Sequence, residues 1–278
     1  MPELPEVEST RRLISRSMAR AHINSVEVRR PDLRQPFPRR FAQRLTGQRV
    51  LALTRRAKYL LASLSSGETL LMHLGMSGSF RTERDNRAGR PAKGAIEQSP
   101  HDHVVFHMST GRRVVFNDPR RFGLMDLVRT QTLDEHPAIK ALGPEPLSPE
   151  FTAAALARAC RGKKTSLKAA LLDQCVVAGL GNIYASEALH VAGLSPRRRA
   201  STLATASGAP REAAFRLTAA IKEVLESAIA RQNVEYRDAR FLVYDRQNEP
   251  CPRNNCMGTI RRRVQGGRST FYCPVCQR

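Results

Sequence analysis

The feature that most constrains the fold of this chain is a set of four cysteines near its C-terminus. Four residues separate Cys251 from Cys256, two separate Cys273 from Cys276, and sixteen lie between the pairs. In a reducing compartment, paired thiolates at these spacings are more typical of tetrahedral zinc than of disulfides. A segment this short buries too little apolar surface to fold alone. We therefore expect one structural Zn2+ held by all four thiolates, on a small β-hairpin.

The whole chain is strongly basic, with a net charge of +21 over 278 residues. Most of its basic residues are arginines, whose guanidinium groups bind phosphates in a bidentate manner. A polyanionic partner, most commonly nucleic acid, is the leading interpretation; a solvated basic surface, as on ribosome-associated or membrane-surface proteins, is the alternative. No apolar run reaches the length of a membrane span and no signal-peptide stretch is present, so we expect a soluble, cytoplasmic protein without a membrane partner.

The order of strand and helix signals predicts an α+β protein. An amphipathic helix to about Met18 precedes strand-like runs at 23–29, 48–54, 59–64, 69–74, 104–108, 113–116 and 124–128, which indicate an antiparallel β-sandwich or barrel. Helical patterns follow at 148–160, 166–174, 182–191 and 211–230. We expect a sandwich domain over 1–130, a linker over 131–150, a helical domain over 151–240 and a zinc finger over 241–278. Residues 84–99 are predicted to form a surface loop.

The chain starts Met-Pro-Glu-Leu-Pro-Glu, and a methionine before proline is normally removed. The mature N-terminus would then be the secondary amine of Pro2, which titrates near pH 8 and is partly unprotonated at neutral pH. Its condensation with an aldehyde carbon gives a cationic iminium, an electron sink for breaking nearby bonds. Glu3 and Glu6 supply carboxyl groups for proton transfer. Because many chains begin Met-Pro without any chemical role, this stretch by itself is a weak signal.

Two loops interrupt the strand pattern and combine apolar with cationic side chains. Residues 73–78 place Met76 between glycines, and residues 118–123 place Arg120 and Arg121 beside Phe122. An unstacked duplex needs an apolar wedge and donors for the orphaned base. The alternative is a core methionine and a surface pair of arginines. The two loops alone favour that alternative, because methionine and phenylalanine are mostly buried.

Two positions in the helical half point to phosphate binding. Asn182 follows a Gly-Leu-Gly turn as a predicted N-cap, where free backbone N–H groups would grip a phosphate. Lys163 precedes another predicted helix. A plain helical hairpin with a solvated basic edge explains this segment equally well. Cys160 and Cys175 lie in apolar runs and are predicted to be core residues.

These pieces together resemble one family, the formamidopyrimidine-DNA glycosylases. The resemblance covers the chain in order, through PELPEVE at 2–8, RRAKYL at 55–60, HLGMSG at 73–78, HDHV at 101–104 and DPRRFG at 118–123. It continues with LGPEPL at 142–147, GLGNIYASEAL at 179–189 and the final RSTFYCPVCQR. It implies a β-sandwich, a helix–two-turn–helix domain and a zinc finger in a bifunctional glycosylase and AP lyase. The implied partner is damaged double-stranded DNA, bound by a monomer without an obligate protein partner.

The family pattern also implies roles for individual residues. Pro2 would attack C1′ of the damaged nucleotide, release the base and form the Schiff base. Glu3 would donate protons during base release and ring opening. Lys58 would donate a proton in β-elimination, and Arg268 in δ-elimination. The implied DNA-binding residues are His73, Met76, His101, Arg120, Arg121, Phe122, Lys163 and Asn182. Among these, Met76, Arg120 and Phe122 would fill the gap left by the flipped nucleotide, with Arg120 facing the orphaned cytosine.

Two departures from the family pattern matter. The first cysteine pair is spaced by four residues instead of the usual two, which the looping out of Asn254 and Asn255 would accommodate. The region 231–243 is shorter than the glycine-containing loop that closes over an oxidised purine in the family, so we expect ring-opened purines to be handled at least as well as 8-oxoguanine. Two rival functions remain, a glycosylase for oxidised pyrimidines and a non-catalytic zinc-finger protein that bends DNA; PELPEVE and DPRRFG argue against the first.

Overall fold

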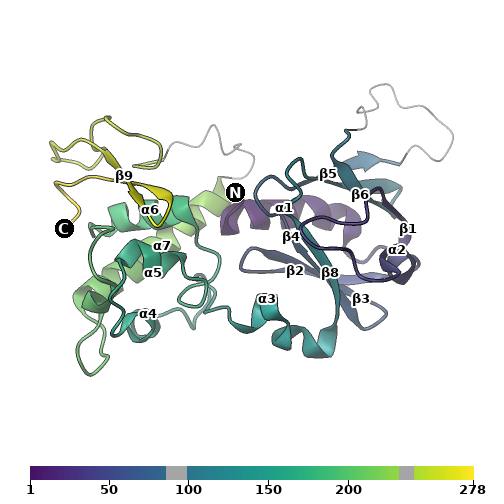
Figure 1. The fold of residues 1–278 in the computed structure, drawn as a ribbon, viewed down its shortest axis with the longest axis horizontal. Helices are drawn as coiled ribbons and strands as arrows, with labels where there is room; N and C mark the ends of the chain where they lie inside the picture. The colour runs from purple at the N-terminus through teal and green to yellow at the C-terminus, as the bar shows by residue number, and fades with distance from the viewer. Residues whose placement is uncertain (86–98, 232–240) are drawn as a thin grey trace. The chain divides into compact units, whose positions relative to one another are not determined.

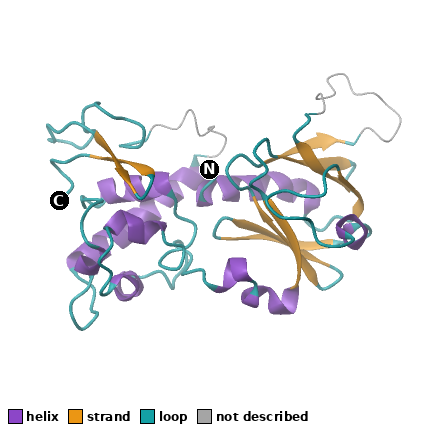
Figure 2. Cartoon of the chain, in the orientation of Figure 1, coloured by secondary structure: helices purple, strands orange, loops and turns teal. Residues whose placement is uncertain are grey.

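A computed structural model describes residues 1–85, 99–231 and 241–278 (Figures 1 and 2). The chain forms two compact units, Met1–Lys140 and Ala141–Arg278. The boundary lies within the segment 131–150 that was expected to be a linker. The 3₁₀ helix η2 (Thr130–Glu135) overlaps the start of that segment, and the short helix α3 (Pro137–Lys140) lies within it. No helix among the described residues is long and apolar enough to cross a membrane.

The first unit confirms the predicted antiparallel sandwich. One sheet has the order β1-β6-β7-β5 and the other the order β2-β3-β4-β8, and all neighbours pair antiparallel. The strands are β1 (Ile23–Val28), β2 (Val50–Arg56), β3 (Tyr59–Leu64), β4 (Glu68–His73), β5 (Ser79–Arg84), β6 (Asp102–Met108), β7 (Arg112–Asn117) and β8 (Leu124–Arg129). Apolar side chains from both sheets, among them Leu60, Met72, Phe106 and Phe116, form one core.

Two of the described helices of this unit pack against its strands. Helix α1 (Leu4–Met18) buries Val7, Ile14 and Met18, as its spacing predicts, and packs against β2 and β5. The short helix α2 (Phe41–Leu45) packs against β1. Strand β5 was not predicted, because its sequence SFRTER has few apolar residues; it lies at a sheet edge beside β7. Most of the predicted surface loop at 84–99 lies outside the described residues.

The second unit is helical and ends in a two-stranded hairpin. Its elements are α4 (Ala153–Cys160), α5 (Leu167–Leu172), α6 (Asn182–Val191), the 3₁₀ helix η3 (Ala200–Leu203), α7 (Glu212–Ala230), β9 (Arg261–Gln265) and β10 (Arg268–Tyr272). Helix α6 contacts α5, α7 and β10, so it links the helices to the hairpin. The predicted fold class, with a helical domain and a hairpin finger, is therefore confirmed.

Three local predictions for this unit need correction. Helix α4 begins after residue 152 rather than at 148, because the Thr152 hydroxyl accepts the Ala155 N–H and caps it there. Gly181, not Asn182, is the N-cap of α6, since the Asn182 side chain turns away to a different partner. Cys160 is buried as expected, but Cys175 is exposed, because it lies in the turn after α5.

Candidate functional site

The two loops of the first unit, residues 73–78 and 118–123, are joined through one buried carboxylate. Asp118 is fully buried, and its Oδ1 accepts the Ser77 hydroxyl at 2.6 Å while its Oδ2 accepts the Gly123 N–H at 2.8 Å. The Arg120 N–H also points to Asp118 Oδ1, at 3.3 Å. The loops approach so closely that a Cβ on Gly75 would lie 2.3 Å from the Phe122 carbonyl carbon. Their relative position is therefore set by tertiary contacts.

One apolar side chain of each loop, Met76 and Phe122, points to solvent. Met76 and Phe122 are each 41% exposed, and Arg120 lies over the Phe122 ring with its guanidinium carbon 4.9 Å from the centroid. The alternative of a core methionine is therefore wrong for Met76. Arg121 adopts a left-handed backbone (φ 57°) and lies 3.8 Å from Asp32. The structure thus brings an exposed methionine, a stacked arginine and an exposed phenylalanine onto adjoining loops.

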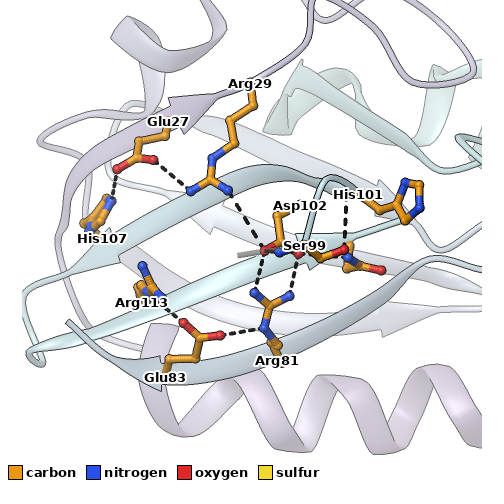
Figure 3. Close-up of polar contacts among 10 residues, drawn as sticks. Glu27, Arg29, Arg81, Glu83, Ser99, His101, Asp102, His107 and Arg113 are labelled. Atoms are coloured by element: carbon orange, nitrogen blue, oxygen red, sulfur yellow. Dashed lines mark hydrogen bonds and ion pairs between the residues drawn. The ribbon is translucent and has the colours of Figure 1, made fainter. Parts of the chain in front are cut away.

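A network of ion pairs supports His101, another predicted DNA-binding residue (Figure 3). Asp102 accepts two hydrogen bonds from the Arg81 guanidinium, at 2.6 Å each, and one from the Ser99 N–H at 3.1 Å. Burial alone would raise the pKa of Asp102, but the hydrogen bonds from Arg81 and Asn117 lower it to about 2. The network continues through Glu27, Arg29, Glu83, His107 and Arg113. His101 itself is exposed, and its carbonyl accepts the N–H of the loop residue Asp118 at 3.0 Å.

Lys58 lies in the turn before β3, and His73 ends β4, the neighbouring strand of the other sheet. Lys58 is 7% exposed, in the turn between β2 and β3, where Ala57 has a left-handed backbone (φ 52°). Burial and the charges of Lys58 and Arg34 lower the pKa of His73 to about 4. His73 Nδ1 accepts the Gly75 N–H at 2.9 Å, which leaves Nε2 as the protonated nitrogen of a neutral ring. The Nε2–H group of the neutral ring can therefore donate a hydrogen bond to a phosphate oxygen.

The N-terminal residues lead directly into α1. Glu3 is only 2% exposed at the N-cap, and the Glu6 carboxylate accepts its backbone N–H at 2.8 Å. Glu3 and Glu6 form a capping box, in which each carboxylate accepts the backbone N–H of the other residue. Pro2 is partly exposed and Met1 is 47% exposed.

In the second unit, Asn182 contacts the hairpin that carries Arg268. Asn182 Nδ2 donates to the Ser269 carbonyl oxygen at 2.9 Å and lies 3.5 Å from the Tyr244 hydroxyl. The buried ammonium group of Lys168 donates to the same Ser269 carbonyl at 3.0 Å and to the Thr270 hydroxyl at 2.8 Å. Arg268 is itself exposed, at the start of β10. Helices α5 and α6 therefore fix the strand from which Arg268 projects.

A cavity of about 330 Å³ lies beside this strand. It is lined by Lys168, Ala169, Leu172, Asp173, Gln265, Gly266 and Arg268. Lys163, the remaining predicted phosphate contact, pairs with Asp173 at 3.4 Å, so it lies next to one wall of this cavity. The lining thus combines the cationic side chains of Lys168 and Arg268 with the carboxylate of Asp173.

Glu187 was not predicted as a site residue from the sequence. It binds the backbone of residues 242–244, which follow α7 in the chain. Its carboxylate is 4% exposed and accepts the backbone N–H groups of Leu242, Val243 and Tyr244 at 2.7 to 2.9 Å. Burial raises the pKa of Glu187, although the three hydrogen bonds by themselves would lower it. This anchor fixes Tyr244 beside Asn182. The region 231–243 that appeared short in the sequence lies mostly outside the described residues.

The four cysteines form one cluster. Their sulfur atoms all lie within 4.8 Å of one another, with Cys251 3.7 Å from Cys276 and Cys256 3.6 Å from Cys273. Four thiolates about 2.3 Å from a tetrahedral zinc would lie about 3.8 Å apart. The cluster therefore fits the single structural Zn2+ that the spacing predicts, and it offers four protein ligands with no open position.

Sequence reasoning missed Asp118, Glu187, Lys168, Arg34 and Tyr244. A lysine inside the apolar run LKAALL was a signal for Lys168, since a lysine on a buried face needs a partner. The other four carry no such signal, because their importance depends on contacts with distant residues.

Comparisons with known proteins agree with this arrangement. The family model for the formamidopyrimidine-DNA glycosylase N-terminal domain matches residues 1–125, the model for the H2TH domain of these enzymes matches 142–239, and the model for a zinc finger found in FPG and IleRS matches 248–278. The formamidopyrimidine-DNA glycosylases of Azorhizobium caulinodans and Methylocella silvestris are 57% and 54% identical to this chain, each over the full length of both chains.

Solved structures give the same result. The MutM (Fpg) protein of Thermus thermophilus is 38% identical with a TM-score of 0.81, over 99% of this chain and 98% of that one. The Lactococcus lactis enzyme, solved in non-covalent complex with DNA that contains an AP site, is 29% identical with a TM-score of 0.85 over all of both chains. With matching domains, cysteine cluster and full-length relatives, the chain belongs to the formamidopyrimidine-DNA glycosylase family of DNA-repair enzymes.

Proposed function

We propose that this chain is a bifunctional DNA glycosylase and AP lyase that excises oxidised purines from duplex DNA and cleaves the strand by β,δ-elimination. The observation that carries the proposal is the pair of loops joined at Asp118, which expose Met76 and Phe122 together with the stacked Arg120. Exposed apolar side chains next to a guanidinium group suit a gap in a base stack, where the wedge replaces stacking and the arginine bonds the orphaned base.

In this proposal the chemistry begins at Pro2, once Met1 has been removed. The secondary amine attacks C1′ and loses its proton, and the bond from C1′ to the damaged base breaks. The C1′–O4′ bond of the sugar then opens, so that the nitrogen is doubly bonded to C1′. Glu3 delivers protons during base release and during ring opening, the latter to O4′. The resulting iminium accepts electrons as the C2′ proton leaves and the C3′–O bond breaks, with Lys58 as proton donor. A second elimination at C5′ follows, with Arg268 as donor. The low exposure of Glu3 and Lys58 supports these roles, because buried groups exchange protons in a site that excludes water.

DNA binding in this proposal uses groups in both units. The neutral His73 and the Asn182 amide donate to backbone phosphates that flank the lesion, with Lys163 and His101 as further phosphate contacts. Arg120 faces the cytosine opposite the lesion, and Arg121 lies beside it on the same loop. We expect a monomer that acts in the cytoplasm without an obligate protein partner.

The proposed substrates are formamidopyrimidines and 8-oxoguanine. Because the 231–243 region is short, we propose that ring-opened purines are processed at least as well as 8-oxoguanine. Steady-state kinetics on duplexes that carry one or the other lesion opposite cytosine test this ranking. A strong preference for 8-oxoguanine would contradict it without affecting the glycosylase assignment.

Borohydride trapping on lesion-containing duplex, followed by mass mapping of the linked residue, tests the mechanism. The proposal requires a covalent adduct at the Pro2 nitrogen in protein that has lost Met1. Pro2→Gly should weaken trapping and base excision while leaving DNA affinity nearly intact. Pro5→Ala is the matched control, since it changes the neighbouring proline of α1 and leaves the terminal amine in place. Full activity in protein that retains Met1, or an adduct mapped to another residue, would refute the role of Pro2.

A further inference from the structure

The C-terminal end of α6 lies against the zinc cysteines. His190, in the last turn of this helix, is 3% exposed, and its Nε2 lies 3.4 Å from Cys251 Sγ. Its other ring nitrogen, Nδ1, is buried and has no hydrogen-bond partner among the described residues. Within the part of the chain that the structure describes, the His190 ring is therefore placed to interact with a zinc ligand and with no other polar group.

The first knuckle, residues 251–256, also contacts this end of α6. Within this first knuckle, Arg253 Nη2 donates to the Val191 carbonyl oxygen at 3.1 Å and also to the His190 carbonyl oxygen. The last carbonyls of a helix lack intrahelical partners and carry partial negative charge, so a guanidinium group suits them. Arg253 is one of the four residues between Cys251 and Cys256.

The direction of the His190 hydrogen bond follows from the chemistry of the ligand. A zinc-bound thiolate has no proton, so the imidazole must donate through an Nε2–H group. This tautomer leaves Nδ1 as a bare acceptor, which is consistent with its lack of a partner. The opposite tautomer would bury an N–H without an acceptor, which is the more costly arrangement.

We propose that His190 and Arg253 are positioning residues of the zinc site. His190 donates a hydrogen bond to the Cys251 thiolate, and Arg253 clamps the first knuckle to the end of α6. Together they slow the release of zinc and tie the metal site to the helix whose first residue is Asn182. The inference goes beyond the proposed function, because it concerns retention of the metal rather than reaction with DNA.

Zinc transfer from the full-length protein to an excess of a chromogenic chelator tests the proposal. His190→Phe keeps the volume of the ring but removes the N–H donor, and Arg253→Ala removes the clamp. We expect each to release zinc about tenfold faster, a typical effect of losing a group that supports a metal ligand. Asn254→Ala is the matched control, because Asn254 is an exposed residue of the same knuckle, and its release rate should be that of the unmodified protein.

The spectrum of the cobalt-substituted protein separates a bond to the thiolate from a general packing role. Loss of an N–H donor raises the energy of the sulfur lone pairs, so the thiolate-to-cobalt charge-transfer band should move to longer wavelength in His190→Phe. In Arg253→Ala the band should stay in place. His190→Gln, which retains an N–H donor, should restore part of the zinc retention.

Two results would overturn the proposal. One is a rate of zinc release in His190→Phe equal to that of the unmodified protein. The other is a cobalt band that does not move in a His190→Phe protein with an unchanged circular dichroism spectrum. Neither result bears on the borohydride adduct at Pro2, so failure here is distinguishable from failure of the proposed function.

Discussion

Replacement of Asp118 by alanine tests whether one buried carboxylate holds the two loops in place. The substitution removes the acceptor of the Ser77 hydroxyl at 2.6 Å and of the Gly123 N–H at 2.8 Å. The Gly123 N–H is buried, so it would lose its partner without gaining water, which costs about 1–3 kcal/mol. The partly buried Ser77 hydroxyl adds about 1 kcal/mol. We therefore expect the free energy of unfolding to fall by about 3 kcal/mol.

The measurement is urea unfolding of the two proteins, together with excision from duplexes that carry the lesion opposite cytosine or adenine. Because Asp118 also orients the Arg120 backbone, the preference for cytosine should decrease in the same variant. Asp126→Ala is the control: this carboxylate, in β8 of the same unit, is partly exposed and pairs with His136 at 3.2 Å, so its loss should cost less than about 1 kcal/mol. Equal stabilities and equal base preferences for Asp118→Ala and the unmodified protein would refute the reasoning.

Two further predictions concern pH and the metal. The pKa of His73 is about 4 in the folded protein and about 6.5 when unfolded, so its contribution to stability is complete above pH 6.5 and is lost as pH falls toward 4. Denaturant titrations across this pH range should show the free energy of unfolding falling by about 2–3 kcal/mol. In His73→Gln this pH dependence should disappear. If the variant kept the pH dependence of the unmodified protein, the burial of a neutral imidazole at His73 would be contradicted. Cys273→Ser should release zinc and weaken binding to abasic-site duplex, measured by metal analysis and fluorescence anisotropy; tight binding by the zinc-free variant would contradict the role of the finger.

Local patterns predicted a large part of this fold. Helix α6 begins and ends at the predicted residues, and the Ser-Ser-Gly and Ser-Thr-Gly turns connect the predicted hairpins, because glycine adopts the left-handed backbone that such turns need. The zinc ligands could also be predicted from the sequence, because the spacing of the cysteines is itself the signal. Strand β5 was missed because a polar edge strand has little apolar periodicity.

The sequence alone therefore determined the fold class, the zinc ligands and the family, all of which depend on residue types at short, fixed spacings. Only the tertiary structure decided whether Met76 is a core residue or an exposed one, and it is exposed. The tertiary structure also revealed that Asp118, Glu187 and His190 hold the site together through hydrogen bonds. The physical reason is that a buried polar side chain acts through the partner it meets in space. The partners Ser77 of Asp118, Leu242 of Glu187 and Cys251 of His190 lie 41 to 61 residues away in sequence. At this distance no local periodicity carries information.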